Sequence, residues 1–268
     1  MEEKNKRIKK LYKYRPLGCR ATKHTFSIIE SNELWFENVA SLNDPFDTSF
    51  SYSEGFLFNT IIKKRMDTLN ISKEEAEKSL GEELLGTTDN LYLDLSRWLE
   101  KRAKLQAQVC CMSKNYDCIV MWSHYASSHT GVVIEFTIQD MKLPIEYDDD
   151  IRSEYLKCKK VDYSEDMLLV TENIINLEEY LDRAIYTKYI HWEYEGEYRF
   201  ILFKPQDYFK KGKLVKFEPA IITKVLLGKD IKPYHEDHLR KICKAKDIPI
   251  AKMIRADKGY RLEMEEIA

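Results

Sequence analysis

Residues 191–203, HWEYEGEYRFILF, decide the fold of this chain. Successive side chains of a β-strand point to opposite faces, so Glu197 and Arg199 share one face of a strand that starts at Glu197. Both faces become apolar further along, which predicts a buried strand with its charges at the entrance. Because unpaired charges are costly to bury, these charges either pair with other side chains or line a cleft.

Apolar and alternating runs elsewhere predict further strands, and helical spacing predicts several helices. The strands are expected at residues 11–15, 34–36, 109–112, 131–136, 155–163, 214–217, 222–227, 249–254 and 260–264. Helices are expected at 25–30, between 55 and 108, at 176–189 and at 233–245, and Ser72 with Glu75 forms a capping box. Regular β-α-β alternation is missing. We therefore expect a single α+β domain over residues 1–268, with a mixed, mostly antiparallel sheet core and a helical insertion at about 55–108.

Composition narrows the class of protein. The formal net charge of −2 over 268 residues argues against non-specific nucleic-acid binding, which needs a basic excess. No apolar stretch reaches membrane-spanning length, and the charged residues 1–10 do not resemble a signal peptide. The six cysteines contain no Cys-x-x-Cys pair, and the histidines have no metal-binding spacing. We expect a soluble cytoplasmic protein that has no metal and no membrane partner.

Four segments in chain order carry a resemblance to a known family. They are LYKYR at 11–15, LNDPFD at 42–47, MWSHY at 121–125 with Thr130 and Gly131, and WEYEGEYR at 192–199. Together they resemble the bacterial domain of unknown function family twenty-nine seventy-one. That family carries no assigned activity, so the resemblance marks these segments as a candidate site without stating its chemistry.

A more distant resemblance is to ADP-ribosyltransferases, which bind NAD in a cleft between two small sheets. Arg15 on the first strand and Glu195-Gly196-Glu197 on a later strand match two of their three site elements. The middle element, a Ser or Tyr, has no clear match; Ser49, Ser51 and Tyr125 are candidates. The resemblance implies a split-sheet α+β fold and NAD as the substrate.

It also implies roles for individual residues. Glu197 would stabilise the positive charge that develops on the ribose when the nicotinamide bond breaks, and Glu195 would orient an acceptor. Arg15 would hold the phosphates through charge-assisted hydrogen bonds. The remaining candidate binding residues, several of them aromatic, are Tyr14, Trp35, Asp47, Trp122, His124, Tyr125 and Arg199.

Each candidate also has a purely structural interpretation. Glu197 and Arg199 would then belong to an ion-pair network at the end of a sheet, and Arg15 would pair with an acidic residue: Glu195, Glu197 or Asp47. Trp122 and Tyr125 would be core aromatics, and His124 a semi-buried histidine. Asn43 and Asp44, which precede a proline, are explained by turn formation alone.

Three functions follow from these patterns. The first is an NAD-using enzyme that transfers ADP-ribose or hydrolyses NAD, with a bacterial toxin or phage-defence role as an extrapolation. The second is a non-catalytic nucleotide-sensing or protein-interaction module with a polar cleft. The third is a nuclease that holds a metal through Asp47, Glu195 and Glu197, which the neutral charge balance disfavours.

Overall fold

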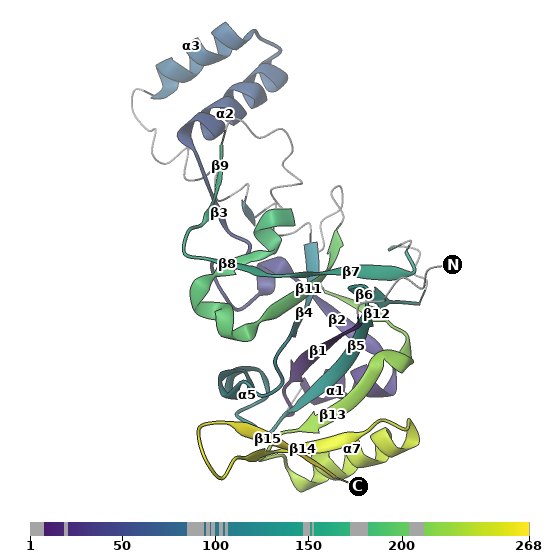
Figure 1. Ribbon diagram of the computed structural model, residues 1–268. Helices are drawn as coiled ribbons and strands as arrows, with labels where there is room; N and C mark the ends of the chain where they lie inside the picture. Colours follow the sequence, from purple (N-terminus) through teal and green to yellow (C-terminus); the bar gives the residue numbers. More distant parts are fainter. Residues whose placement is uncertain are drawn as a thin grey trace, which may run out of the picture.

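The computed structural model has an α+β fold (Figure 1). It describes residues 8–18, 21–84, 94, 97, 100–101, 104, 107–146, 151, 153–171, 182–203 and 212–267. The α- and 3-10 (η) helices are α1 (Ala21–Glu30), η1 (Val39–Ser41), α2 (Glu54–Leu69), α3 (Lys73–Leu84), α5 (Ile119–Tyr125), η2 (Ile190–Glu195), η3 (Pro219–Ile221) and α7 (Pro233–Ala245). The strands are β1 (Ile8–Arg15), β2 (Glu33–Asn38), β3 (Phe50–Tyr52), β4 (Ala107–Ser113), β5 (Val132–Gln139), β6 (Lys142–Pro144), β7 (Tyr155–Lys160), β8 (Asp162–Ser164), β9 (Leu168–Val170), β10 (Thr187–Tyr189), β11 (Glu197–Phe203), β12 (Lys213–Lys216), β13 (Ile222–Leu227), β14 (Ile250–Arg255) and β15 (Leu262–Glu266).

The main sheet closes on itself through its first strand. Eleven strands belong to it, in the order β12-β2-β4-β11-β7-β6-β5-β13-β14-β15, and β1 pairs antiparallel with both β4 and β5. The pairing therefore runs round a ring of β1, β4, β11, β7, β6 and β5. All pairs in the ring are antiparallel, which confirms the α+β class and the mostly antiparallel core. The split-sheet arrangement of ADP-ribosyltransferases stays a prediction.

Alternation along β1 lets this strand serve two cores. Leu11 is fully buried in the larger core with Phe136, Phe200 and Phe217. Tyr12 and Tyr14 point the other way, into a second core against α5, where Trp122 is fully buried. Helix α1 packs against β2 and against α7, and the two helices lie together at one side of the sheet (Figure 1). Burial on both faces fixes the register of β1, because a shift by one residue would exchange the two sets of side chains.

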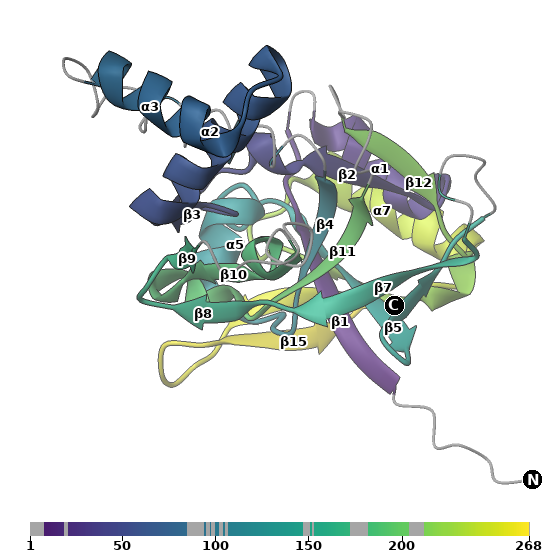
Figure 2. The same cartoon turned by 90° about the horizontal axis from the view of Figure 1, so that it is seen from above.

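Helices α2 and α3 project from the sheet as an antiparallel pair (Figure 2). Their contact buries a small apolar cluster that includes Ile62 and Leu80. The predicted capping box is confirmed: the Ser72 hydroxyl accepts from the Glu75 amide at 3.2 Å, and the Glu75 carboxylate accepts from the Ser72 amide at 2.8 Å. The predicted helical segment continues to residue 108. Of residues 85–106, the structure describes only 94, 97, 100–101 and 104.

Most predicted elements are confirmed, and one is wrong in part. Helix α7 has the predicted bounds, and the predicted strand at 155–163 is divided between β7 and β8. The prediction of a helix at 176–189 is wrong for its last three residues. Residues 187–189 form β10, which pairs in parallel with β8. Hydrogen bonds to β8 outweigh the helical spacing there, and residues 176–181 lie outside the described part of the chain. Over the described residues, no helix is long and apolar enough to cross a bilayer.

Because β1 closes the ring of strands, shortening a buried and an exposed side chain of this strand should change the stability of the protein by different amounts. Leu11→Ala is expected to lower the free energy of unfolding by about 2–5 kcal/mol, because it leaves a cavity in the main core. Ile8→Ala is the control, since Ile8 is 64% exposed on the same strand, and it is expected to change stability by about 0.5 kcal/mol or less. Denaturant unfolding measures both values; equal losses would contradict the proposed role of Leu11.

Candidate functional site

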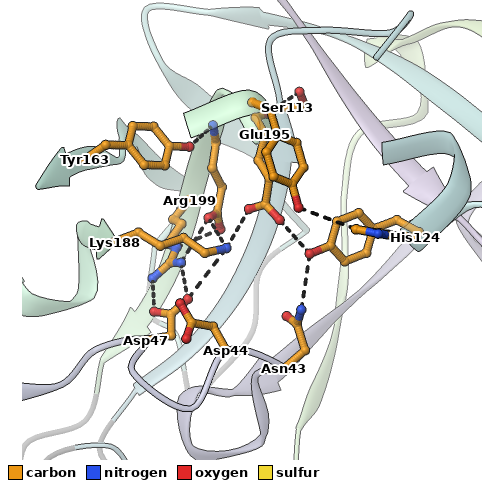
Figure 3. Close-up of polar contacts among 12 residues, drawn as sticks. Asn43, Asp44, Asp47, Ser113, His124, Tyr163, Lys188, Glu195 and Arg199 are labelled. Atoms are coloured by element: carbon orange, nitrogen blue, oxygen red, sulfur yellow. Dashed lines mark hydrogen bonds and ion pairs between the residues drawn. The ribbon is translucent and has the colours of Figure 1, made fainter. Parts of the chain in front are cut away.

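Arg199 on β11 lies at the centre of a buried ion-pair network (Figure 3). Its guanidinium is fully buried and grips Asp47 through two hydrogen bonds of 2.8 and 2.7 Å. Its Nε donates to the Glu197 carboxylate at 2.7 Å, and Nη1 also donates to the backbone carbonyl of Ile185 at 2.6 Å. These contacts satisfy a buried arginine with two carboxylates and a carbonyl. The interpretation of Glu197 and Arg199 as an ion-pair network is therefore confirmed.

Lys188 on β10 extends the network to a third carboxylate. Its Nζ lies 2.5 Å from Glu195 Oε2 and 3.2 Å from Glu197 Oε2, with Asp47 at 3.9 Å. Its side chain is about as buried as those of its partners. Three carboxylates thus face two cations, Lys188 and Arg199, so the cluster carries one excess negative charge when all five groups are ionised.

The network separates the pKa values of its two glutamates. Burial disfavours the charge on Glu197, but Arg199 and Lys188 outweigh burial and lower its pKa to about 2. Among the described residues, Glu195 has Lys188 as its one cationic contact, so burial prevails and raises the pKa of Glu195 above its ordinary value. Burial works against Lys188 as well, yet the charges of the two glutamates raise its pKa. Glu195 is therefore the carboxyl of the pair that takes up a proton more readily.

Glu195 is held by a chain of hydrogen bonds that starts at the turn before β3. The Asn43 amide donates to the Tyr125 hydroxyl at 3.2 Å, and that hydroxyl donates to Glu195 Oε1 at 2.5 Å (Figure 3). Ser113 at the end of β4 donates to the backbone carbonyl of Glu195 at 2.5 Å. Gly196 follows with φ of 50°, a left-handed conformation that ends η2. This turn leads directly into β11 and brings the two flanking glutamates into one network.

A cavity of about 330 Å³ opens beside the network. Lys13 and Arg15 of β1 line it together with Trp35 of β2. The Lys13 ammonium donates to the backbone carbonyl of Cys111 at 2.7 Å. The Nε of Arg15 is buried and has no hydrogen-bond partner in the part of the chain that the structure describes, and burial lowers the pKa of this guanidinium. The cavity lining therefore combines the carboxylates of the network with a cation that has no acidic partner among the described residues.

The structure brings most of the predicted site residues together. The cavity lining includes nine of them: Tyr14, Arg15, Trp35, Asp47, His124, Tyr125, Glu195, Glu197 and Arg199. Trp122 is the exception. Its indole is fully buried in the second core, stacks edge-on against Tyr14 and donates to the Tyr116 carbonyl at 2.7 Å, so it is a core aromatic and offers no stacking face to a ligand.

The purely structural interpretation is wrong for Arg15 and His124 and is confirmed for Asp44. Arg15 makes no ion pair with Glu195, Glu197 or Asp47 among the described residues. His124 is exposed at the cavity rim, 3.4 Å from the Tyr194 hydroxyl, and is not semi-buried. Asp44 forms the expected turn, because its carboxylate accepts from the Phe46 amide at 2.9 Å.

Sequence reasoning missed Lys188 entirely. It lies in the segment read as an amphipathic helix, and its neighbours form no motif that indicates an ion pair. Lys13 lies within one of the four family segments, where its neighbours indicate no role for it, and turn formation alone explains Asn43 in the sequence. Within the described ranges, no group of three or more His, Cys, Asp or Glu side chains is placed to hold a metal ion.

Comparisons with known proteins agree with the resemblance to a family of unknown function. Residues 121–200 match the model of the family described as "Protein of unknown function (DUF2971)". The matched part runs from α5 to β11 and includes Tyr125, Lys188, Glu195, Glu197 and Arg199. No curated protein and no solved structure gave a significant match.

The network predicts a large loss of stability when its central cation is removed. Arg199→Leu leaves Asp47 and Glu197 buried without their main partner and is expected to cost about 3–5 kcal/mol of unfolding free energy. Arg261→Leu is the matched control, because that side chain is 66% exposed in its pair with Glu263; it should cost about 1 kcal/mol or less. Denaturant unfolding compares the two, and a loss for Arg199→Leu no larger than the control's would contradict a buried network.

The lowered pKa of Glu197 predicts loss of stability in acid. In the unfolded chain a glutamate has a pKa of about 4.3, so at Glu197 the folded state binds fewer protons between that value and about 2. Its stabilising contribution is present above this window and is lost as the pH falls through it. The raised pKa of Glu195 has the opposite effect on stability: its contribution falls as the pH rises, and only at pH values above the ordinary pKa of a glutamate.

Unfolding free energies of the parent and of Glu197→Gln, measured through this pH window, test the assignment. The parent should show the steeper decline, because the glutamine has no proton to gain. Glu193→Gln is the control, since Glu193 is exposed on η2, and it should follow the parent. A profile for Glu197→Gln as steep as the parent's would show that another group causes the decline.

Proposed function

We propose that the cavity binds the nicotinamide end of NAD and that the protein breaks the bond between nicotinamide and ribose. One observation carries this proposal: Arg15, which has no acidic partner among the described residues, lines the same cavity as Glu195, whose carboxyl has a raised pKa. A phosphate-bearing substrate with a sugar would supply what each group lacks. NAD consumption would also suit a role in bacterial conflict, such as phage defence.

Arg15 supports a phosphate contact. Arg15 is half-buried and has no acidic partner among the described residues, so its guanidinium gains a charge-assisted hydrogen bond when a phosphate enters, and its planar fork suits two phosphate oxygens. Lys13 lies two residues earlier on the same strand and also lines the cavity, so it adds positive potential there. The buried carboxylates already have Lys188 and Arg199, which leaves the charge of Arg15 available to a ligand.

Aromatic side chains at the cavity support binding of the ring. Trp35 is half-buried, and its indole Nε1 donates to Glu37 at 2.9 Å, which fixes the plane of the ring. Tyr125 and His124 lie on α5 at the other side, with ring centroids 6.2 Å apart. The cavity of about 330 Å³ is at the small end of the range for ligand pockets, so it suits one half of a dinucleotide, with the other half over the rim.

Glu195 is the proposed catalytic residue, and Glu197 supports it. Both oxygens of Glu197 are engaged by Arg199, at 2.7 and 3.0 Å, so this carboxylate is a poor acceptor for a ribose hydroxyl. Glu195 has one contact on each oxygen, Tyr125 on one and Lys188 on the other, and each oxygen retains a lone pair. In this proposal Glu195 therefore takes the charge-stabilising role that the ADP-ribosyltransferase resemblance gives to Glu197.

The reaction needs only water as the second substrate. The bond between C1′ of the ribose and the pyridinium nitrogen breaks, its electron pair neutralises nicotinamide, and the ribose becomes oxocarbenium-like. The negative carboxylate of Glu195 stabilises that charge. Water then forms the new bond to C1′, and its proton passes to Glu195 and on to solvent. ADP-ribose transfer would place an acceptor nucleophile where the water attacks.

Nicotinamide release from NAD by the purified protein tests this proposal. Glu195→Gln keeps the size of the side chain but removes its negative charge, and it is expected to lower turnover at least about a hundredfold. Glu193→Gln lies on the same 3-10 helix, is exposed and does not line the cavity, so turnover should be unchanged. Thermal unfolding with NAD reports binding separately for all three proteins.

The outcomes separate the parts of the proposal. Turnover by Glu195→Gln at the parent's rate would remove Glu195 from the catalytic role. A parent that neither releases nicotinamide nor is stabilised by NAD would contradict the whole proposal. Stabilisation without release would favour the second candidate, a non-catalytic nucleotide-binding module, which is consistent with the contacts that already occupy both glutamates.

A further inference from the structure

A second cavity, of about 260 Å³, adjoins the proposed active site at Lys188. Its walls come from the turn at Phe46, the segment from β8 to β9, and β10. Lys188 is the one residue shared by the linings of the two cavities among the described residues. The second cavity is therefore lined almost entirely by other residues than the first, and nothing in the proposed reaction uses it.

Large apolar side chains are exposed around this cavity. Phe46 is 65% exposed, Met167 44% and Tyr189 43%, and all three line it. They come from three separate segments, so the fold brings them to one place. Exposed apolar groups gathered around a hollow are typical of an interaction site, whereas isolated ones need no explanation.

The charges beside these apolar groups are acidic. Glu165 and Asp166 form the turn between β8 and β9, and both are exposed and line the cavity. Neither side chain forms an ion pair with any other described residue. Of the described residues that line the cavity, Lys188 is the one cation, and its charge is directed to Glu195 and Glu197. The cavity therefore offers a negative potential to an approaching ligand.

The backbone around the cavity favours an extended polypeptide as the ligand. Two separate ribbons meet there, β3 with β9 and β8 with β10, and each has only two strands among the described residues. A two-stranded ribbon leaves the outer edge of each strand with unpaired amide and carbonyl groups. An extended segment can add to such an edge as a further strand, with side chains in neighbouring pockets.

We propose that this cavity is a docking site for an extended basic segment of a partner protein, in which Lys or Arg lies beside an aromatic or aliphatic residue. The basic side chain pairs with Glu165 and Asp166, and the apolar one packs between Phe46, Met167 and Tyr189. The proposal does not depend on NAD chemistry in the first cavity, because the two linings share only Lys188.

Selection from a display library of short random peptides tests this proposal with the full chain as bait. Enriched peptides should combine Lys or Arg with an aromatic or aliphatic residue. The best peptide is then synthesised with a fluorophore and titrated by anisotropy. Reversing the charges with Glu165→Lys and Asp166→Lys, or removing the apolar contact with Phe46→Ser, should each weaken binding at least about tenfold.

Matched controls separate this surface from general charge and stickiness. Tyr234→Ser removes another exposed aromatic, 61% exposed on α7, and Asp257→Lys with Glu265→Lys reverses two exposed acids near β15. Both should bind like the parent. Equal unfolding temperatures of parent and variants exclude unfolding as the cause of a loss. No enrichment, enrichment of acidic peptides, or equal affinity of the parent and the cavity variants would overturn the proposal.

Discussion

The buried guanidinium of Arg199 is the constraint on which the site depends. A charge without solvent must be surrounded by hydrogen-bond acceptors, and here these come from Asp47, Glu197 and the carbonyl of Ile185. The three acceptors belong to three different segments, so the network fixes the turn before β3, the chain before β10 and the entrance to β11 relative to one another. Removing the cation would leave the carboxylates of Asp47 and Glu197 repelling each other, which favours separation of these segments.

Once Arg199 and Lys188 have neutralised two carboxylates, the remaining charges define the cleft. Glu195 is left with a raised pKa and a hydrogen-bond chain from Asn43 through Tyr125. Arg15, on the strand that closes the ring, is left without an acidic partner among the described residues. A structural network and a ligand site are thus compatible here: the network satisfies most of the charges, and what it leaves unsatisfied faces the cavity.

Local patterns predicted much of this arrangement. The alternation after Glu197 correctly placed Glu197 and Arg199 on one face, and the four family segments, including the turn with Asp47 and the Tyr125 helix, do meet at one cavity. The helix at 233–245 was predictable because Pro233 and its apolar spacing both act locally. These features depend on residues close together in sequence.

Other features depend on contacts that a single sequence does not display. Lys188 was missed because residues 187–189 form a strand only through pairing with β8. Trp122 was counted as a stacking residue because its place in a motif does not show which side of α5 faces the core. Arg15 has no acidic partner among the described residues because the acids expected to pair with it contact Lys188 and Arg199. These long-range contacts are not visible in the sequence.

Binding of ADP-ribose to Arg15 tests the central claim, that the network leaves this cation free for a phosphate-bearing ligand. Isothermal titration calorimetry can compare the parent with Arg15→Met and with Arg255→Met, a control at an exposed arginine of β14. The account predicts binding to the parent and to Arg255→Met, and at least about tenfold weaker binding to Arg15→Met. Equal affinity for all three proteins, or no binding to the parent, would contradict it.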